Sequence, residues 1–223
     1  MGTLYIVATP IGNLKDITLR ALETLKGADL ILAEDTRVIQ KLLFHYEIKR
    51  LVKRYDEYSR LGIYEEIKEK LKKGGNVALV ADAGTPGIAD PGSKLVEFIK
   101  KELPGVSVTP LPGASAITAA LSASGLRADK FTFLGYPPHK KGREKFFRSL
   151  EGLKIRPVVL YESPYRVLKA LASLSQVFGP DYEIVVGREL TKIHEEIWKG
   201  SLKDAAEHFT GERKRGEFVL IIP

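Results

Sequence analysis

Short apolar runs alternate with helical patterns of apolar positions along the chain, and residues 77–99 show this most clearly. Residues 77–81 form an apolar, β-branched run with the length of a buried strand. A loop rich in glycine and proline follows at 82–92, and apolar positions then recur at helical spacing, with Pro91 expected in the first turn of the helix. The pattern predicts a strand, a loop and a helix. It puts the loop at the carboxyl end of a parallel strand, where open α/β sheets bind ligands.

The same alternation recurs on both sides of this unit. Further runs of strand length occupy residues 4–8, 29–33, 51–54, 106–109, 131–134, 157–161, 182–186, 194–198 and 218–222, with 194–198 expected at a sheet edge. Helical patterns lie between them, and Asp16 is expected to cap the helix that follows the first strand. The chain is therefore predicted to be an α/β protein. Because the pattern restarts near residue 113 after a proline-rich link, we expect two α/β domains, 1–112 and 113–223.

The loop at 82–92 carries the most distinctive chemistry. It contains three glycines, two prolines and the carboxylates of Asp82 and Asp90. It matches neither the Walker pattern nor Gly-x-Gly-x-x-Gly, so no phosphate-binding lysine accompanies it. Exposed backbone beside a carboxylate suits a ligand with a ribose and an ammonium or sulfonium group better than a polyphosphate. A well-formed turn without a ligand explains the loop equally well when it is judged alone.

Two other strand ends are candidates for a ligand site. Residues 9–13 form a Pro-Gly-Asn loop after the first strand, although an ordinary turn also explains them. After the second strand, Glu34, Asp35, Thr36 and Arg37 place two carboxylates, a hydroxyl and a guanidinium in a row. A helix cap accounts for Asp35 or Thr36. It does not account for Glu34 and Arg37 together.

Composition limits the classes of protein to consider. The chain of 223 residues is 44% hydrophobic, enough to bury a core, and it has no cysteine, which excludes disulfides and thiolate chemistry. No apolar stretch approaches the roughly 20 residues of a membrane span, and residues 1–10 lack the basic start of a signal peptide. No His or Cys cluster has metal-ligand spacing. We therefore expect a cytoplasmic protein without a metal.

The positive charge is concentrated in the second half. The formal net charge is +7, and residues 1–112 carry 17 Lys and Arg against 15 Asp and Glu, while 113–223 carry 18 against 13. The most basic segment, 139–148, has Phe146 and Phe147 among its cations, an arrangement that suits a nucleic-acid backbone. The residues expected to bind RNA are Lys140, Lys141, Arg143, Lys145 and Arg148. A solvated loop leading into a helix is the alternative.

Eight segments together resemble one family over essentially the whole chain. They are TPIGNLKDITLRAL (9–22), AEDTR (33–37), DAGTPGIADPG (82–92), PLPGASAITAALSASGL (110–126), FLGYPP (133–138), YESPYRV (161–167), RELTK (188–192) and RGEFVLII (215–222). Their order and spacing are similar to the tetrapyrrole-methylase-like (class III) methyltransferases, within a branch that acts on ribosomal RNA. The resemblance implies two α/β domains with S-adenosyl-L-methionine in the cleft between them. It also implies a homodimer that methylates a cytidine ribose 2′-hydroxyl in the decoding region of 16S rRNA.

The resemblance also implies roles for individual residues. The cofactor is expected to contact Pro10, Asp82, Ala83, Gly84, Thr85, Ser115, Ala116, Leu160, Leu190 and Glu217. The target ribose is expected to be surrounded by Glu34, Asp35, Arg37 and Lys192, which lie at two strand ends, one from each half. Glu34, Asp35 and Lys192 are all candidates for the base that accepts the hydroxyl proton, and Arg37 is a candidate for holding a phosphate.

Two departures and two alternatives accompany this interpretation. Relatives usually have a motif with histidine and asparagine where this chain has YDEYS at 55–59, and many continue beyond the last strand into an extension expected to add RNA-docking surface. The first alternative is a tetrapyrrole C-methyltransferase, which the basic second half disfavours. The second is a non-catalytic RNA- or ribosome-binding module, which the full set of loop motifs disfavours.

Overall fold

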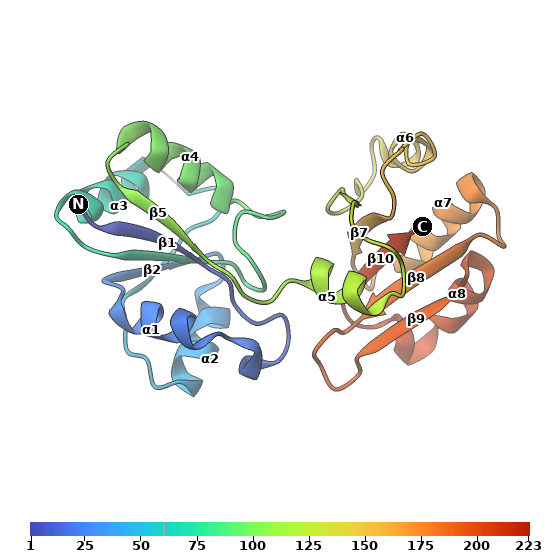
Figure 1. The fold of residues 1–223 in the computed structure, drawn as a ribbon, viewed down its shortest axis with the longest axis horizontal. Helices are drawn as coiled ribbons and strands as arrows, with labels where there is room; N and C mark the ends of the chain where they lie inside the picture. Colours follow the sequence, from blue (N-terminus) through green and yellow to red (C-terminus); the bar gives the residue numbers. More distant parts are fainter. Residues whose placement is uncertain (60) are drawn as a thin grey trace. The chain divides into compact units, whose positions relative to one another are not determined.

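Two compact units, Met1–Ser115 and Ala116–Pro223, make up the chain. The computed structural model describes residues 1–59 and 61–223. Each unit contains a five-stranded sheet with helices packed on it (Figure 1). The predicted α/β class is therefore confirmed. The two units divide after residue 115, whereas the sequence placed a domain boundary after residue 112.

The sheet of the first unit is entirely parallel. Its strands are β1 (Thr3–Val7), β2 (Leu30–Ala33), β3 (Val52–Arg54), β4 (Val77–Val80) and β5 (Ser107–Leu111). They are arranged in the order β3-β2-β4-β1-β5, and every neighbouring pair is parallel. β2 and β4 are completely buried, as expected for strands covered on both faces. Because all five strands run in one direction, the loops that leave their carboxyl ends lie at one edge of the sheet.

Helices cover both faces of this sheet. They are α1 (Leu19–Gly27), α2 (Thr36–His45), α3 (Leu61–Lys72) and α4 (Gly92–Glu102), with a 3₁₀ turn, η1, at Leu14–Asp16. α1 and α2 contribute Leu25 and Leu42 to one core, while α3 and α4 contribute Ile67 and Leu95 to another on the opposite face (Figure 1). Each helix returns the chain to the amino ends of the strands, as in doubly wound α/β proteins.

Three local predictions were wrong. Asp16 does not cap α1, because it lies in η1; Thr18 is the cap, and its hydroxyl accepts a hydrogen bond from the Ala21 amide at 3.1 Å. Pro91 precedes α4 rather than lying in its first turn. The edge strand begins at Glu196 rather than residue 194, because the backbone turns at 191–195, where the Thr191 amide donates to the Glu195 carboxylate.

The sheet of the second unit is mixed. Its strands are β6 (Thr132–Phe133), β7 (Val158–Glu162), β8 (Glu183–Arg188), β9 (Glu196–Ser201) and β10 (Phe218–Ile222). The order is β6-β7-β10-β8-β9; β6 and β7 are parallel, and β10 lies antiparallel between β7 and β8. The carboxyl ends of β6, β7 and β8 therefore share one sheet edge with the start of β10.

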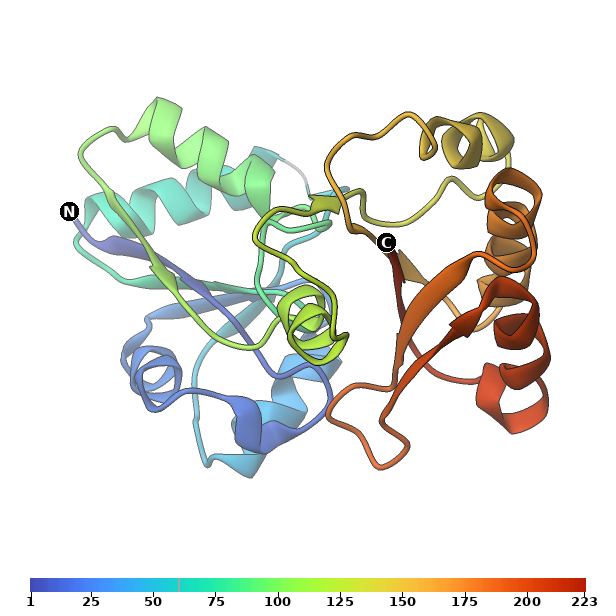
Figure 2. The same ribbon diagram turned by 45° about the vertical axis from the view of Figure 1, so that its right-hand side comes forward.

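One face of this second sheet carries the main hydrophobic core of the unit. Its helices are α5 (Ala116–Ala123), α6 (Arg143–Ser149), α7 (Val167–Phe178) and α8 (Leu202–His208), and η2 spans Gly211–Lys214. Phe147 of α6, Leu171 of α7 and Ala205 of α8 belong to the core on that face. α5 lies next to β10 on the other face (Figures 1 and 2). None of the described helices is long and apolar enough to cross a membrane.

A buried ion cluster ties α6 and α7 to the end of β7. The Glu162 side chain is 0% exposed, and its carboxylate pairs with Arg166 Nε at 3.0 Å and Arg143 Nη2 at 3.4 Å. Arg143 also donates to the Pro138 carbonyl at 3.1 Å and lies over the Phe147 ring. The cluster therefore fixes the loop that leads into α6.

We expect Glu162→Ala to lower the free energy of unfolding by about 3 kcal/mol, because it leaves two largely buried guanidinium groups without their counter-ion. Urea unfolding followed by circular dichroism measures this. The matched control is Glu144→Ala, which removes an exposed pair with Arg148 in α6 and should change stability by less than about 0.5 kcal/mol. Equal losses in the two variants would show that the Glu162 cluster contributes no more than a surface pair.

Candidate active site

Hydrogen bonds join three loops at the carboxyl edge of the parallel sheet. The Thr9 amide donates to the Gly84 carbonyl at 2.9 Å, and the Gly84 amide donates to the Thr9 carbonyl at 3.1 Å. The Asp35 amide donates to Asp82 Oδ1 at 2.9 Å, which ties the loop after β2 to the loop after β4. The three strand ends that the sequence singled out are therefore neighbours in the structure.

A cavity of about 230 Å³ lies among these loops. Its lining residues are Thr9, Pro10, Ile11, Gly12, Leu14, Val38, Ile39, Lys41, Leu42, Ala81, Asp82 and Ala83. Three of the residues expected to bind a cofactor, Pro10, Asp82 and Ala83, are among them. Most of the lining residues from the loop after β1 and from α2 are apolar, but α2 also contributes Lys41, and the loop after β4 adds the carboxylate of Asp82.

The loop after β4 keeps its shape through its own polar groups. Gly84 has φ +76°, and a Cβ there would lie 3.4 Å from Ile11 Cγ2 and 3.6 Å from the Ala114 carbonyl oxygen. Thr85 donates its hydroxyl to the same carbonyl at 3.5 Å. The Asp90 carboxylate accepts from the amides of Gly87 and Gly92 at 2.7–2.9 Å. Asp90 therefore braces the loop from within.

Glu34 is a carboxylate at this edge whose pKa is raised. It is half-buried, and in residues 1–59 and 61–223 no hydrogen bond or ion pair to its carboxylate is seen. Burial raises the pKa of Glu34, and the negative charges of Asp82, Asp90, Asp56 and Glu57 raise it further. The sequence did not single out Asp56 and Glu57, from the 55–59 segment, as neighbours of Glu34.

Asp35 and Arg37 are occupied with each other. Asp35 caps α2 by accepting from the Arg37 amide at 2.9 Å, and its carboxylate also accepts from the Arg37 guanidinium at 2.5–3.2 Å. These side-chain and backbone hydrogen bonds lower the pKa of Asp35 to about 2. The helix-cap explanation therefore holds for Asp35, which is a weak base. The Arg37 side chain is 88% exposed.

In the second unit, Lys192 lies at the edge shared by the ends of β7 and β8. Its ammonium donates to Glu189 Oε1 at 2.7 Å and to Glu217 Oε2 at 2.8 Å. Burial opposes the charge of Lys192, but the two hydrogen bonds and the negative charges of Glu189 and Glu217 together outweigh it and raise the pKa of the ammonium. Lys192 is therefore held in the charged form.

The other predicted cofactor contacts differ in how accessible they are. Leu160 is 0% exposed and belongs to the hydrophobic core, and it lies in β7 between two neighbouring strands, so its surface is covered by the protein itself. Leu190 is also buried, whereas the Glu217 side chain is exposed. Ser115 and Ala116 are half-buried where α5 begins.

The loop after β8 has a strained backbone that the sequence did not indicate. Glu189 and Thr191 have φ +48° and +65°, values that are unusual for any residue with a side chain and most of all for a β-branched one. The Thr191 hydroxyl is buried, and no hydrogen-bond partner is found for it in the described chain. The Arg188 guanidinium donates to the His194 carbonyl in this loop and to the carbonyls of Glu212 and Arg215, so it joins the loop to the segment before β10.

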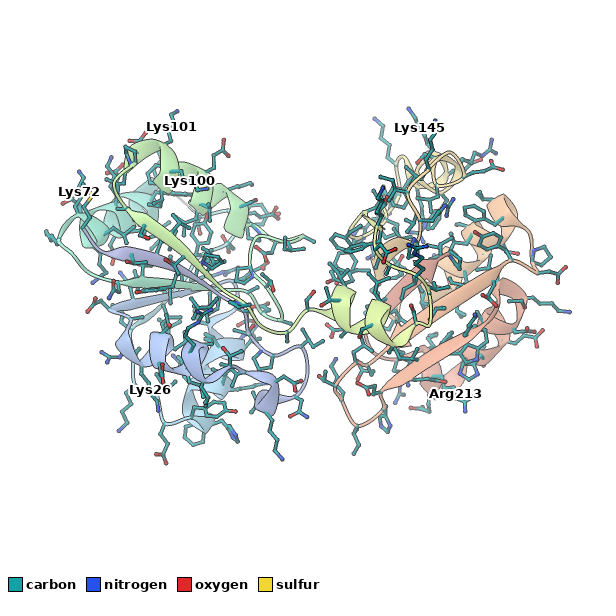
Figure 3. The ribbon with its side chains drawn as sticks, viewed as in Figure 1. Lys26, Lys72, Lys100, Lys101, Lys145 and Arg213 are labelled. Carbon is teal, nitrogen blue, oxygen red and sulfur yellow. The ribbon has the colours of Figure 1, made fainter. Side chains whose placement is uncertain are left out.

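The basic run is a solvated turn followed by α6, as one of the two interpretations expected. Lys140 and Lys141 are exposed before α6, and Lys145 extends from it (Figure 3). Arg148 pairs with Glu144 at 2.6 Å. Arg143 is committed to the Glu162 cluster, so its guanidinium is not free for a phosphate. Lys140, Arg143 and Arg148 also line a cavity of about 580 Å³ beside α7.

Solved structures identify the class of fold. Over 99% of this chain and 97% of the other, the protein matches the native uroporphyrin-III C-methyltransferase from Thermus thermophilus with a TM-score of 0.68 at 17% identity. It matches cobalt precorrin-4 methyltransferase, CbiF, with a TM-score of 0.70 at 20% identity over 99% of this chain and 94% of the other. The fold is thus that of tetrapyrrole methyltransferases.

Sequence comparison identifies the family. The model of the Tetrapyrrole (Corrin/Porphyrin) Methylases matches residues 3–206. A protein named ribosomal RNA small subunit methyltransferase I from Synechocystis is 47% identical over 100% of this chain and 79% of its own length. One of the same name from Thermotoga maritima is 43% identical over 100% of this chain and 98% of its own length. The chain belongs to the tetrapyrrole methylase family. It is therefore a methyltransferase that uses S-adenosyl-L-methionine.

The raised pKa of Glu34 predicts a pH-dependent effect of Glu34→Gln. A carboxyl whose pKa is higher in the folded state than its ordinary 4.5 ionises more easily in the unfolded chain. As the pH rises above 4.5, this difference lowers the free energy of unfolding. The neutral variant avoids this cost. Glu34→Gln should therefore be more stable than wild type at about pH 8, and the difference should vanish near about pH 4.

Thermal unfolding of both proteins across this pH range measures the effect. Glu97→Gln, at an exposed position on α4, is the matched control and should show no such crossover. A Glu34→Gln variant that is less stable than wild type at neutral pH would mean that the Glu34 carboxylate has a stabilising partner.

Proposed function

We propose that this methyltransferase acts on a ribose hydroxyl in the RNA of the small ribosomal subunit. In its finer form, the proposal is that a homodimer in the cytoplasm methylates the 2′-hydroxyl of a cytidine in the decoding region of 16S rRNA. The observation that carries the proposal is the 42–47% identity of relatives that are named ribosomal RNA small subunit methyltransferase I and match almost the whole chain. The positive charge of the second half supports an RNA substrate.

The carboxyl edge of the first unit fits the cofactor. S-adenosyl-L-methionine, when bound, supplies a methyl group made electrophilic by a sulfonium, and it carries an ammonium as well. Asp82 and Glu34 place negative charge where two cationic groups need it, and the loop at Gly84 brings bare backbone to the site. Further proposed contacts are Pro10, Ala83, Thr85, Ser115, Ala116, Leu190 and Glu217, with Leu160 buried behind the strand end.

Glu34 is the base that the surroundings favour. Asp35 is held ionised by Arg37, and Lys192 is held protonated by Glu189 and Glu217, so neither accepts a proton readily. A carboxylate whose pKa is raised is a better match to the working pH. Glu34 takes the proton of the ribose hydroxyl while the oxygen bonds to the methyl carbon and the sulfur keeps the electron pair. Alignment of these atoms supplies the larger part of the rate.

Arg37 and Lys192 are proposed to hold the substrate. Both are cationic at neutral pH, and the Arg37 guanidinium is exposed although it is paired with Asp35. A phosphate beside the target ribose competes with these carboxylate partners, because charge-assisted hydrogen bonds to phosphate are of similar strength. Lys140, Lys141, Lys145 and Arg148 extend the phosphate path, and Arg143 supports them structurally.

Filling the cavity tests the cofactor site. Ala83 is an exposed residue that lines the cavity, so Ala83→Phe fills it without the backbone strain that any side chain at Gly84 would introduce. We expect the Kd for S-adenosylmethionine to rise by at least about tenfold, equivalent to about 1.4 kcal/mol, with little change in Tm. Isothermal calorimetry measures this.

The control for that experiment is Ala172→Phe, at an exposed position of α7 in the second unit, which should bind the cofactor as wild type does. Unchanged affinity in Ala83→Phe would move the cofactor away from this cavity.

Removing the base tests the role of Glu34. We expect Glu34→Gln to slow single-turnover methylation by about 10²- to 10⁴-fold, the range for loss of a general base, while cofactor affinity falls much less. Asp35→Asn should slow the reaction less than Glu34→Gln. A Glu34→Gln enzyme with wild-type single-turnover rate would assign the proton to another acceptor, such as water.

The substrate itself is tested by methyl transfer from labelled S-adenosylmethionine to three acceptors: isolated 30S subunits, naked 16S rRNA and a porphyrinoid. We expect label on a single cytidine ribose of the ribosomal RNA, mapped by nuclease digestion and mass spectrometry. Labelled porphyrinoid would favour the C-methyltransferase alternative suggested by the solved neighbours. Cofactor binding with no labelled acceptor would contradict the RNA proposal. Light scattering that gives the mass of one chain would contradict the homodimer.

A further inference from the structure

Two exposed tyrosines project from the edge of the second sheet that carries Lys192. Tyr136 follows β6 and is 51% exposed, and Tyr165 follows β7 and is 88% exposed. Because β6 and β7 are parallel neighbours, both rings leave the sheet at the same edge. Single exposed aromatic residues are ordinary on protein surfaces. Two exposed tyrosines at a sheet edge that also carries cations indicate a binding surface more strongly than a single one does.

Tyr136 stands on a rigid base. Its ring packs against the Tyr161 ring at a centroid distance of 5.4 Å, and Tyr161 packs against Phe133 at 5.0 Å. The Tyr161 amide donates to the Gly135 carbonyl at 2.9 Å, which fixes the backbone just before Tyr136. Burial raises the pKa of Tyr136, and the nearby charge of Glu217, the partner of Lys192, raises it further. Tyr136 thus lies near Glu217, whose carboxylate also accepts a hydrogen bond from Lys192.

Tyr165 also stands on a fixed turn. The Arg166 amide donates to the Ser163 carbonyl at 3.0 Å, and Arg166 Nε donates to Ser163 Oγ at 3.1 Å and pairs with the buried Glu162 carboxylate. Pro164 restricts the backbone between them. The turn is therefore held from below, while the ring of Tyr165 faces solvent. A ring on a backbone that is already held in place loses less conformational entropy when a ligand stacks on it than a ring on a mobile loop does.

Cations lie near the two rings in the sequence or at the same sheet edge, and charged groups of both signs, Glu217, Glu162 and Arg166, act on Tyr136. Lys140 and Lys141 follow Tyr136 within one short loop, and Lys192 lies at the same sheet edge. Aromatic rings interleaved with cations are the arrangement by which proteins bind single-stranded nucleic acid, since bases stack on the rings and the cations follow the phosphates. A duplex hides the faces of its bases, so rings that project from a sheet edge cannot stack on it without unpairing.

We propose that Tyr136 and Tyr165 form a stacking platform for two bases of a single-stranded RNA segment. This inference rests on the proposed function and adds the state of the substrate: the RNA reaches this edge unpaired. Stacking is tolerant of base identity, because every base has a π face. The platform therefore contributes affinity and position, while the choice of nucleotide is made elsewhere.

The test uses the full-length protein and a fluorescein-labelled oligocytidylate of about ten nucleotides, within the usual site size for single-strand binding. Anisotropy titrations compare wild type with Tyr136→Ala, Tyr165→Ala and the corresponding phenylalanine variants. We expect each alanine variant to bind about 5- to 100-fold more weakly, the effect of losing one stacked base. The phenylalanine variants, which retain the ring, should bind as wild type does.

Salt dependence separates stacking from charge. Loss of a ring removes no phosphate contact, so the alanine variants should keep the wild-type slope of log Kd against log salt concentration. Lys141→Ala should reduce the slope by about 0.7, the value for one phosphate contact on a single strand. Phe44→Ala, which removes a ring that is 87% exposed on α2 of the first unit, is the matched control and should change neither quantity.

The outcomes distinguish this inference from the proposed function. Wild type could methylate ribosomal RNA and bind the oligonucleotide while both tyrosine-to-alanine variants bind it equally well. That result would contradict the stacking platform and leave the proposed function intact. Tighter binding of a hairpin duplex than of the single strand would overturn the inference too. If wild type transfers no methyl group to RNA, the proposed function fails first. Circular dichroism and cofactor affinity establish that each variant is folded.

Discussion

The direction of the five parallel strands in the first unit determines where its chemistry lies. Because β1, β2 and β4 are adjacent and point the same way, the loops after them meet at one edge. The pairing of Thr9 with Gly84 and of Asp35 with Asp82 then fixes those loops to one another. If any one of these strands ran in the other direction, its loop would lie at the opposite end of the sheet and the cavity would not form. The candidate site is thus a consequence of topology, and individual side chains refine it.

The same edge concentrates negative charge at a cost in stability. Glu34 lies close enough to Asp82, Asp90, Asp56 and Glu57 for all of them to raise its pKa, and no compensating partner is seen in the described part of the chain. Elsewhere the protein neutralises its buried carboxylates, as Glu162 shows between Arg143 and Arg166. Unfavourable electrostatics of this kind are typical of functional sites, where a ligand supplies the missing charge. A sulfonium cofactor is a ligand of the right sign.

The sequence predicted what depends on local patterns. The strand at Phe218–Ile222 and the class of the fold follow from runs of apolar residues, and the loops after β1, β2 and β4 were recognised from their glycines, prolines and carboxylates. Contacts between residues far apart in the sequence could not be predicted from local patterns. Arg143 looked like a phosphate ligand because its partner, Glu162, lies 19 positions away in the sequence. Leu160 was expected to contact the cofactor, and nothing local reveals that its side chain turns into the core.

The proposed binding site for S-adenosylmethionine is the carboxyl edge of the first sheet. Hydrogen–deuterium exchange of the full chain, with and without the cofactor, tests it most directly. We expect slower exchange on binding at backbone amides within residues 9–12, 34–37 and 82–85, because the three loops close on the same ligand. Protection that leaves these three loops unchanged and appears only on the outer helices would contradict it.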